Sequence, residues 1–486
     1  MCGIFGILSK TQKPINEEAE ILAQSLNKRG PDGFGIYTHE KTNYYKHETK
    51  IKLEETTIAL GHCLLSTTGF GKQPMQEKET AIAHNGTIYN YQEFCQEKKA
   101  KSDSYAILEF ITTQKQEKKE TNLDFLKKTL KEFSKKAIGE YAIGIMKEKD
   151  LFAFRDFTGQ KPVWYGETKN AYAFASEPNA LKKIGVDYTQ PLIPGNLLQI
   201  TKKGFKTHKV YNLKDFIKEA KTKKTKETLK QIFEKTIEMQ TKNINKAAIL
   251  FSGGIDSSLI AKTISEKVQT KLFVAGTKES HDLKEAKQTA KEIGLELIET
   301  EIEENQAKEI MIECTTVIPF CDKMQLALAI TEMTCAKAIK KENIRVVFTG
   351  QGSDELFCGY NSYLNTLKKE GYEGIEKEIE YSTANMWARN FAREDAIFAN
   401  QSLEIRLPFF AQNMIKKALS IKAKEKIKSE KDILRKHPIR ELAKQLGLKE
   451  QIYTKQKKSM QYGSGTQKII EKLLNEKKCK QHDKDQ

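Results

Sequence analysis

Two glycine-rich segments in the second half of the chain carry residue types that bind phosphate. The first, SGGIDSS (252–258), lies between an apolar run and a helical pattern. Its glycines and serines offer backbone and hydroxyl donors at a helix N-terminus, where a pyrophosphate group is stabilised. The second, TGQGSDE (349–355), again follows an apolar run. Because open parallel sheets bind nucleotides beyond the ends of their strands, the two segments predict one shared crevice.

Each glycine-rich segment also contains an acid that could hold a metal ion. Asp256 and Asp354 are candidate ligands for Mg²⁺ bridging the phosphates, since hard cations prefer carboxylate oxygen. Either residue could instead cap a helix.

Cys2 is a candidate nucleophile because of its position. Removal of Met1 would leave a thiol and a free α-amine on one residue. The pKa of such an amine is about 7.7–8.0, so it can accept the thiol proton directly or through water. From the Met-Cys start alone, the favoured interpretation is that Cys2 is an apolar residue of a strand. The chain has eight cysteines, and none of them belongs to a C-x-x-C pair.

Length and composition predict a globular protein of two or three domains. The 486 residues are 38% hydrophobic and 30% charged. The net charge of +17 comes mostly from lysine spread along the chain, without a concentrated arginine and aromatic surface, which disfavours a nucleic-acid binder. No run approaches the roughly 20 apolar residues of a membrane span. The start lacks a basic segment before its short apolar run, so we expect no membrane association and a cytoplasmic location.

Up to about residue 200, short apolar or alternating runs and glycine-bearing turns predict a sheet-rich domain. Two helical stretches are expected near 16–28 and 103–135. The expected strands lie at 2–8, 33–38, 57–65, 80–90, 141–147, 151–156 and 171–176, with a closing turn and strand at 191–200.

The second half predicts an α/β domain. Apolar runs at 247–251, 271–277, 296–302 and 344–350, with helical patterns between several of them, predict a parallel sheet with helices on both faces. The pattern after about residue 360 is mainly helical. The expected domains are 1–205, a lysine-rich linker at 206–230, 231–475, and a frayed tail at 476–486.

Four segments of the first half resemble the class II glutamine amidotransferase domain in order and spacing. They are MCGIFGI (1–7), RGPDGFGIY (29–37), HNGTIYN (84–90) and KSDSYAIL (101–108). The resemblance covers roughly residues 2–200. It implies an α+β fold of two stacked antiparallel sheets between helices, similar to N-terminal nucleophile hydrolases, with Cys2 attacking the amide of glutamine.

The resemblance assigns roles to the residues that match these motifs. Asn85 and Gly86 correspond to the oxyanion hole, in which each donor contributes about 3–4 kcal/mol. Asp103 corresponds to the acid that binds the α-ammonium of glutamine, with a helix N-cap as the alternative. The glutamine-binding residues implied are Leu65, Ser66, Thr67, Thr68, Asn85, Gly86, Thr87 and Asp103.

Leu64 departs from this family pattern. Where the family has an arginine that binds the α-carboxylate of glutamine, this chain has GHCLLSTTG. Glutamine could be held by backbone groups of residues 65–68 or by Arg29, or free ammonia could be the preferred nitrogen donor.

The second half resembles the ATP pyrophosphatases, and with the first half it resembles the glutamine-hydrolysing asparagine synthetases. The segments on which this resemblance rests include SGGIDSS, TGQGSDE, ANMWARNFAREDAIFANQSLEIRLPFF, KDILR and YTKQKKSMQYGSG. TGQG and QYGSG are similar to an archaeal-type asparagine synthetase-like subgroup. The ATP-binding residues implied are Phe251, Ser252, Gly253, Gly254, Asp256, Ser257, Ser258, Ala275, Thr349, Gly350 and Lys457. Arg393, Glu404 and Arg406 are expected to form a buried charged scaffold.

Gln351 is the second departure, because asparagine synthetases commonly have glutamate at this catalytic position. Glutamine cannot act as a base, but it can orient substrate, and a carboxylate nucleophile is already ionised at pH 7. Deprotonation of the attacking ammonia then needs another acceptor, such as Glu355 or a phosphate.

The resemblance implies a substrate set of glutamine, aspartate and ATP with Mg²⁺. The products expected are asparagine, AMP and pyrophosphate, formed through a Cys2 thioester and β-aspartyl-AMP. A related amidotransferase or lactam-forming synthetase acting on another carboxylate, and a noncatalytic regulatory homologue, remain alternatives. The oligomeric state is open, with a homodimer as one state.

Overall fold

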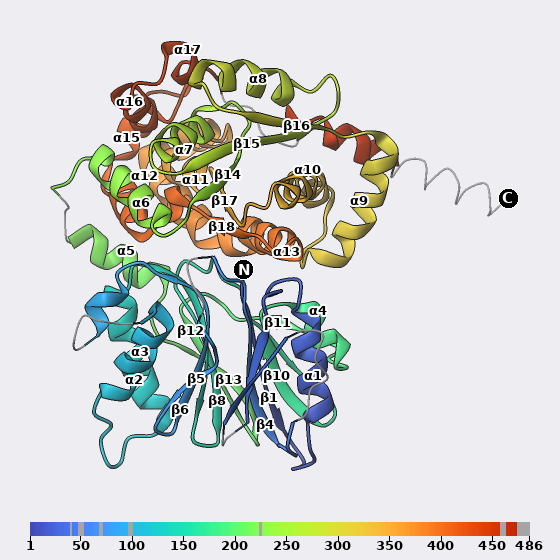
Figure 1. Cartoon of the computed structure of the whole chain (residues 1–486). Coiled ribbons are helices and arrows are strands. Elements are labelled where there is room, and N and C mark those ends of the chain that lie inside the picture. The colour runs from blue at the N-terminus through green and yellow to red at the C-terminus, as the bar shows by residue number, and fades with distance from the viewer. Residues whose placement is uncertain are drawn as a thin grey trace. The chain divides into compact units, whose positions relative to one another are not determined.

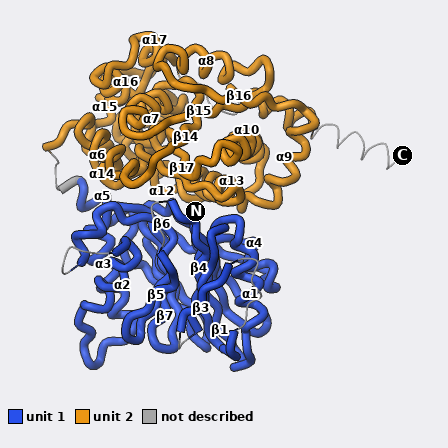
Figure 2. The backbone as a smooth tube through the Cα atoms, viewed as in Figure 1, with its two compact units in different colours: residues 1–222 blue, residues 223–486 orange. Residues whose placement is uncertain are grey.

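The computed structural model describes residues 1–38, 41–46, 53–67, 71–95, 101–222, 226–456 and 463–473. The chain forms two compact units, residues 1–222 and 223–486 (Figure 2). Among the described residues, no helix has the length and apolar character of a membrane span.

The first unit contains two antiparallel sheets, as predicted (Figure 1). Their facing sides share an apolar core to which both sheets contribute, for example Ile4 and Leu60 from one and Ala83 and Ala142 from the other. The seven-stranded sheet has the order β11 (Gln190–Pro191), β9 (Trp164–Glu167), β10 (Ala171–Ala175), β1 (Gly3–Ser9), β4 (Ile58–Cys63), β2 (Phe34–Tyr37), β3 (Thr42–Tyr45). The six-stranded sheet has the order β13 (Gly204–Lys209), β12 (Asn196–Thr201), β8 (Asp150–Arg155), β7 (Gly139–Lys147), β6 (Thr80–Ile88), β5 (Met75–Glu77).

Helices cover the sheets of the first unit. α1 (Asn16–Ser25) and α4 (Pro178–Lys183) bury apolar residues against the seven-stranded sheet. The stretch near 103–135 is helical as predicted, but it is divided into α2 (Asp103–Thr113) and α3 (Asn122–Lys136), and this interruption was not predicted. α2 ends where Gln114 becomes extended, and the Thr121 hydroxyl accepts a hydrogen bond from Asp124 N to start α3. A 3₁₀ turn, η1 (Tyr91–Phe94), precedes α2.

Residues 204–222 form regular structure in the first unit. Strand β13 pairs with β12, and α5 (Leu213–Thr222) follows it. Phe216 of α5 stacks on Phe157, with ring centroids 4.6 Å apart. The compact units therefore divide after residue 222, whereas the domain limits at 205 and 230 remain predictions.

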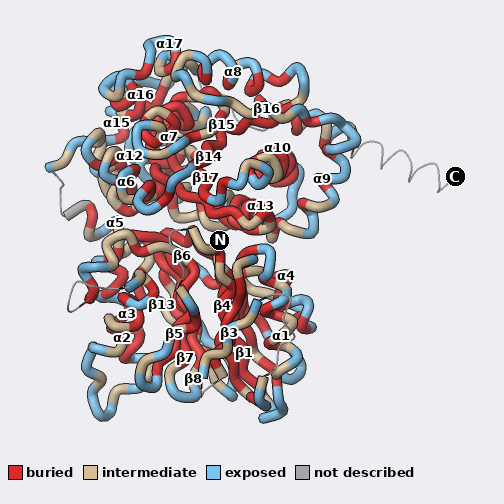
Figure 3. The backbone as a smooth tube through the Cα atoms, viewed as in Figure 1, coloured by how far each residue is buried: buried red, intermediate tan, exposed pale blue. Residues whose placement is uncertain are grey.

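The second unit is built on a five-stranded parallel sheet. Its order is β16 (Leu297–Glu301), β15 (Gln269–Gly276), β14 (Lys246–Leu250), β17 (Val346–Phe348), β18 (Glu404–Arg406). Figure 3 shows β14 and β17 buried, which explains their continuous apolar sequences. Strand β18 was not predicted, because Glu404 and Arg406 are charged and it has only three residues. Their ion pair, 2.7 Å between Nη2 and Oε1, allows both to be buried.

Helices make up most of the rest of the second unit, and the described residues after 360 are mainly helical, as predicted. Gly371, with φ of 68°, kinks the longest of them, α12. The helices are α6 (Leu229–Thr241), α7 (Ile255–Ser265), α8 (His281–Ile293), α9 (Glu304–Val317), α10 (Lys323–Lys341), α11 (Ser353–Phe357), α12 (Ser362–Met386), η2 (Trp387–Phe391), α13 (Ala392–Asn400), η3 (Pro408–Phe410), α14 (Gln412–Ser420), α15 (Ala423–Lys426), α16 (His437–Gln445) and α17 (Glu450–Tyr453).

Candidate active sites

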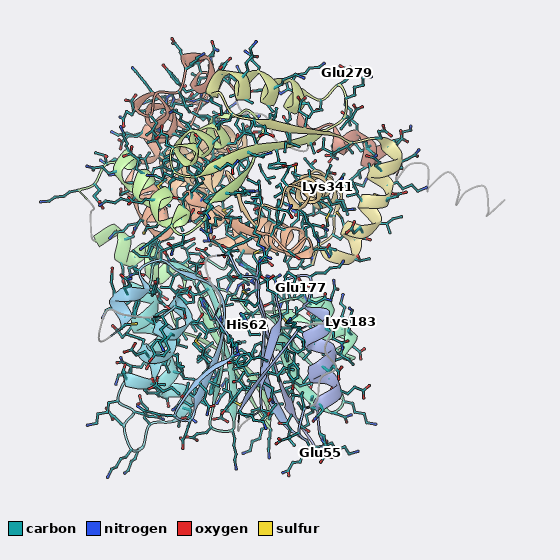
Figure 4. The ribbon with its side chains drawn as sticks, viewed as in Figure 1. Glu55, His62, Glu177, Lys183, Glu279 and Lys341 are labelled. Carbon is teal, nitrogen blue, oxygen red and sulfur yellow. The ribbon has the colours of Figure 1, made fainter. Side chains whose placement is uncertain are left out.

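Cys2 directly precedes β1 in the first unit and is half-buried. Its Sγ accepts a hydrogen bond from Leu65 N at 3.4 Å. The buried Arg29 guanidinium donates from Nε to Cys2 O at 2.9 Å and pairs through Nη1 with Glu177, labelled in Figure 4, at 3.2 Å. Arg29 therefore holds the backbone of the candidate nucleophile. This commitment makes it a poor anchor for a substrate carboxylate.

The segment after Leu64 is fixed by its own backbone donors. Leu64 N donates to Gly33 O at 2.8 Å, Leu65 N donates to Cys2 Sγ, and Ser66 N donates to Asp32 Oδ2 at 2.8 Å. These three N–H groups are therefore engaged within the protein. They are not available to a glutamine carboxylate in this structure. Thr68 lies outside the described residues.

Asn85 and Gly86 lie in β6, paired with Ala142 and Tyr141 of β7. Asn85 is 1% exposed, and its Nδ2 has no hydrogen-bond partner among the described residues. A buried amide without an acceptor costs free energy unless a ligand supplies one. At Gly86, with φ of 149°, a Cβ would lie 2.1 Å from Glu140 O, so only glycine fits.

His62 and His84 lie in the strands that lead to Leu64 and to Asn85, respectively. His62 (Figure 4) lies in β4 and His84 in β6. Burial, reinforced by the neighbouring His84, lowers the pKa of His62 to about 3. Burial also lowers the pKa of His84. Both imidazoles are therefore uncharged near neutral pH.

Asp103 contacts the end of β6 that carries Asn85–Thr87. Its Oδ2 accepts from Ile88 N at 3.1 Å, and its Oδ1 accepts from Ser104 N at 2.8 Å. The N-cap of α2 is Ser102, whose hydroxyl accepts from Tyr105 N at 3.1 Å. Asp103 is thus the first residue of the helix, and its carboxylate, about a quarter exposed, can contact a substrate ammonium.

The second unit has a cavity of about 730 Å³ at the carboxyl ends of β14, β15 and β17. This volume is in the range of small-molecule sites. Both glycine-rich segments line this cavity, as expected if they share one crevice. The predicted site residues in its wall are Phe251, Ser252, Gly254, Asp256, Ser257, Ala275, Thr349, Gly350, Gln351 and Asp354.

Two of the predicted ATP-binding residues that the structure describes, Gly253 and Ser258, do not line this cavity wall. Gly253 adopts φ of 74° and packs against α8, where its carbonyl accepts from Thr289 Oγ1 at 3.2 Å. Ser258 is completely buried in the first turn of α7. Both residues therefore help to shape the loop but do not contribute to the cavity wall. Lys457 lies outside the described residues.

Lys436, which was not predicted, joins the two candidate metal ligands. Its Nζ lies 2.6 Å from Asp256 Oδ2 and 2.6 Å from Asp354 Oδ1. Ser353 Oγ also donates to Asp256 Oδ1 at 2.6 Å. The two carboxylates predicted to act together are therefore brought to one ammonium group. The only sequence signal was the adjacent KDILR motif.

Gln351 forms a hydrogen-bonded group with two residues near the start of α13. Its Nε2 donates to Glu394 Oε1 at 2.6 Å, and its Oε1 accepts from Asn390 Nδ2 at 2.9 Å. Glu394 is 1% exposed, lines the cavity, and its Oε2 has no hydrogen-bond partner among the described residues. Burial, followed by the nearby Glu332 carboxylate, raises the pKa of Glu394 to about 8. A carboxyl group that can exchange a proton near neutral pH therefore lies beside Gln351.

Known proteins match this arrangement over both units. The model of the family described as Asparagine synthase matches residues 228–373 and 368–485. The chain belongs to the asparagine synthase family. A second family, described as Glutamine amidotransferase domain, matches residues 1–192. Family membership implies a carbon–nitrogen ligase that uses ATP, with glutamine and aspartate as the substrates of its two domains.

Individual relatives support the same family over nearly the full length. A protein of Methanocaldococcus jannaschii, provisionally named asparagine synthetase (glutamine-hydrolysing) 1, is 28% identical over 97% of this chain and 95% of its own. Asparagine synthetase (glutamine-hydrolysing) 2 of Oryza sativa is 26% identical over 87% of this chain and 69% of its own. A solved glutamine phosphoribosylpyrophosphate amidotransferase of Bacillus subtilis is 20% identical over 57% of this chain and 67% of that one, with a TM-score of 0.37.

Arg393 and Glu332 form an ion pair in the wall of the asparagine synthase cavity. Arg393 Nε lies 2.9 and 3.1 Å from the two Glu332 oxygens, and its Nη1 donates to Gln325 Oε1 at 2.7 Å. Both charged side chains are at most 3% exposed. With its donors directed at these protein groups, Arg393 fits the predicted scaffold role.

Replacing Arg393 with methionine is expected to lower the free energy of unfolding by about 3–5 kcal/mol, because Glu332 would remain buried and unpaired. Urea denaturation of the purified chain measures the change. The matched control is the double variant Arg393→Met/Glu332→Leu, which removes both charges and is expected to regain most of the loss. Equal destabilisation of the single and double variants would contradict this role.

Proposed function

We propose that the protein is a glutamine-hydrolysing asparagine synthetase that makes asparagine, AMP and pyrophosphate from aspartate, ATP and glutamine-derived ammonia. The observation that carries the proposal is the cavity of the second unit, whose wall is formed at two strand ends. One strand end contributes Ser252, Gly254 and Asp256, and the other contributes Thr349, Gly350 and Asp354. The match of residues 1–192 to the glutamine amidotransferase domain supports glutamine as the proposed source of nitrogen.

In the proposed glutaminase reaction, Cys2 Sγ attacks the side-chain carbonyl of glutamine after removal of Met1. The Cys2 α-amine takes the thiol proton and returns it to the leaving nitrogen, so that ammonia departs and a glutamyl thioester remains. Water then hydrolyses the thioester to glutamate. The buried Asn85 Nδ2 and the Gly86 N–H are the proposed donors to the oxyanion. Asp103 is the proposed partner of the substrate ammonium.

In the proposed synthetase reaction, the β-carboxylate of aspartate attacks the α-phosphorus of ATP and displaces pyrophosphate. The resulting β-aspartyl-AMP is attacked by ammonia, and AMP leaves as asparagine forms. Donors at the start of α7, including Ser257, and of the loop at Ser252 are proposed to hold the pyrophosphate. Lys457 is proposed as a further phosphate ligand.

Asp256 and Asp354 are proposed to hold Mg²⁺ together with the substrate phosphates. Their carboxylate oxygens suit this ion, which usually binds one or two carboxylates plus phosphate oxygens and water. Within the described ranges, no group of three or more His, Cys, Asp or Glu residues could hold a metal by itself. Bound Mg²⁺ would neutralise phosphate charge as pyrophosphate leaves.

Glu394 is the proposed acceptor for the proton of the attacking ammonia. It has an oxygen without a hydrogen-bond partner among the described residues, and it contacts Gln351, which replaces the family glutamate. Glu355, the acceptor considered from sequence, also lines the cavity, and burial followed by Asp354 raises its pKa. Tyr360 Oη donates to Glu355 Oε1 at 2.7 Å. Glu394 is favoured because its hydrogen bond connects it to the residue at the reaction centre.

A product assay tests the proposed function. Incubation of the full chain with aspartate, ATP and Mg²⁺, once with glutamine and once with ammonium, should yield asparagine, AMP and pyrophosphate in equal amounts. Formation of ADP in place of AMP would contradict the mechanism. Pyrophosphate exchange with another carboxylic acid but not with aspartate would indicate a related synthetase, and exchange with no acid would indicate a noncatalytic homologue.

Asn85→Ala is expected to reduce the glutaminase kcat by about 10²–10³, the effect of losing one oxyanion donor. Because Nδ2 has no protein partner among the described residues, stability should change little. Glutamate release from glutamine measures the rate, and a thermal melt checks the fold. An unchanged kcat would show that Asn85 does not donate a hydrogen bond to the oxyanion.

A further inference from the structure

The ammonium group of Lys436 occupies the space between two carboxylates. Its Nζ is 2.6 Å from one oxygen of Asp256 and 2.6 Å from one oxygen of Asp354, and it donates to Ser353 Oγ at 3.3 Å. The Lys436 side chain is 2% exposed. A buried ammonium is stable only when its charge and its donors are matched, and these three partners provide that match.

The backbone around Lys436 holds this arrangement in place. Arg435 and Lys436 both adopt left-handed conformations, with φ of 48° and 52°, which non-glycine residues rarely do. Arg435 is buried and donates from Nε to Gly359 O at 3.2 Å. At Gly359, a Cβ would lie 1.8 Å from Asp354 Oδ1 and 2.4 Å from Lys436 Cε. A side chain at position 359 would therefore have to displace the ion pair.

A divalent cation and the Lys436 ammonium cannot share this position. Mg²⁺ binds oxygen at about 2.0–2.1 Å, so an ion shared by both carboxylates would need the space that Nζ fills. Two cations this close in a buried site would also repel strongly. The carboxylates can therefore bind a shared metal only after Lys436 has another partner.

We propose that Lys436 is the resident cation of the carboxylate pair, which keeps Asp256 and Asp354 together and excludes a divalent ion until nucleotide binds. The phosphates of the nucleotide supply new acceptors for the ammonium, so the metal enters together with the phosphates. Lys436 is thus a positioning residue that orders metal and nucleotide binding. The inference rests on the proposed function in assigning this cavity to a nucleotide.

Binding of Mn²⁺ alone to the metal-free full chain tests the proposal, with electron paramagnetic resonance as the readout. Without nucleotide, Lys436→Met is expected to bind Mn²⁺ roughly tenfold or more tightly than the wild type, because two carboxylates lose their internal cation. Adding Asp354→Asn to Lys436→Met should abolish the gain. Lys431→Met, the removal of an exposed lysine nearby, should leave the wild-type affinity unchanged. Equal affinity in the wild type and Lys436→Met would overturn the proposal.

The wild type also provides a test that does not depend on the folding of Lys436→Met. A nonhydrolysable ATP analogue is expected to raise its Mn²⁺ affinity, and Asp354→Asn should reduce Mn²⁺ binding only when the analogue is present. Nucleotide-free Mn²⁺ binding that Asp354→Asn removes would contradict the proposal. Failure of the analogue itself to bind would instead contradict the nucleotide function, and the nucleotide-free comparison would still decide the role of Lys436.

Discussion

Replacing Cys2 with alanine is expected to abolish glutamine-dependent asparagine formation and to leave the ammonium-dependent rate unchanged. Alanine has no thiol, so the glutamyl thioester cannot form. The cavity proposed for the synthetase reaction is lined by residues 250–456 of the second unit, so its chemistry does not need Cys2. Asparagine formation with each nitrogen source, measured side by side, gives the two rates.

Cys63→Ala is the matched control for Cys2→Ala. Cys63 lies in β4, pairs with Gly3 and is completely buried. Burial, followed by the nearby Cys2, raises the pKa of the Cys63 thiol, so Cys63 should remain protonated and unreactive. Cys63→Ala should therefore retain both rates. Glutamine use that survives in Cys2→Ala would exclude Cys2 as the nucleophile.

The shared cavity could be predicted because its segments directly follow buried strands. Apolar runs ending at Leu250 and Phe348 indicated parallel strands, and the carboxyl ends of such strands meet at one edge of a sheet. Local sequence therefore determined which loops come together. It could not show that Gly253 and Ser258 are directed away from the cavity, because this depends on how the turn packs on α8.

Lys436 and Glu394 were missed because their surroundings depend on distant residues. Lys436 pairs with an acid 180 positions away, and a chain with 82 Lys and Arg residues gives one lysine no local signal. Only the family resemblance predicts that Arg393 is buried, because the charged run Arg393–Asp395 by itself is typical of a solvated helix face. In the fold it is buried, because Glu332 of α10 compensates the charge of Arg393.

Glu394→Gln is expected to lower kcat for asparagine formation with ammonium by about 10²–10⁴, the usual contribution of a proton acceptor. Glutamine has nearly the same shape, so the contact with Gln351 can be kept while the basic oxygen is lost. Pyrophosphate exchange with aspartate should be much less affected, because the acyl-adenylate forms before ammonia is deprotonated. Glu355→Gln is the comparison variant. If Glu355→Gln lowers kcat by this amount and Glu394→Gln leaves it unchanged, Glu355 is the proton acceptor instead.

The pKa of Glu394 gives this role a pH dependence. Because burial and Glu332 raise that pKa from 4.5 to about 8, most Glu394 carboxyls are protonated at pH 7 and become acceptors as pH rises. Hydroxylamine can replace ammonia as the nucleophile in this test, because it stays uncharged between pH 7 and about pH 8. The wild-type kcat with hydroxylamine should rise with pH up to about pH 8, whereas the kcat of Glu394→Gln should not change with pH. The folded state binds this proton more tightly than the unfolded state, so the stability from Glu394 is full below pH 4.5 and is lost as pH rises to about 8. Activity and stability should therefore change in opposite directions across one pH window, a coupling that a merely structural carboxyl group would not produce.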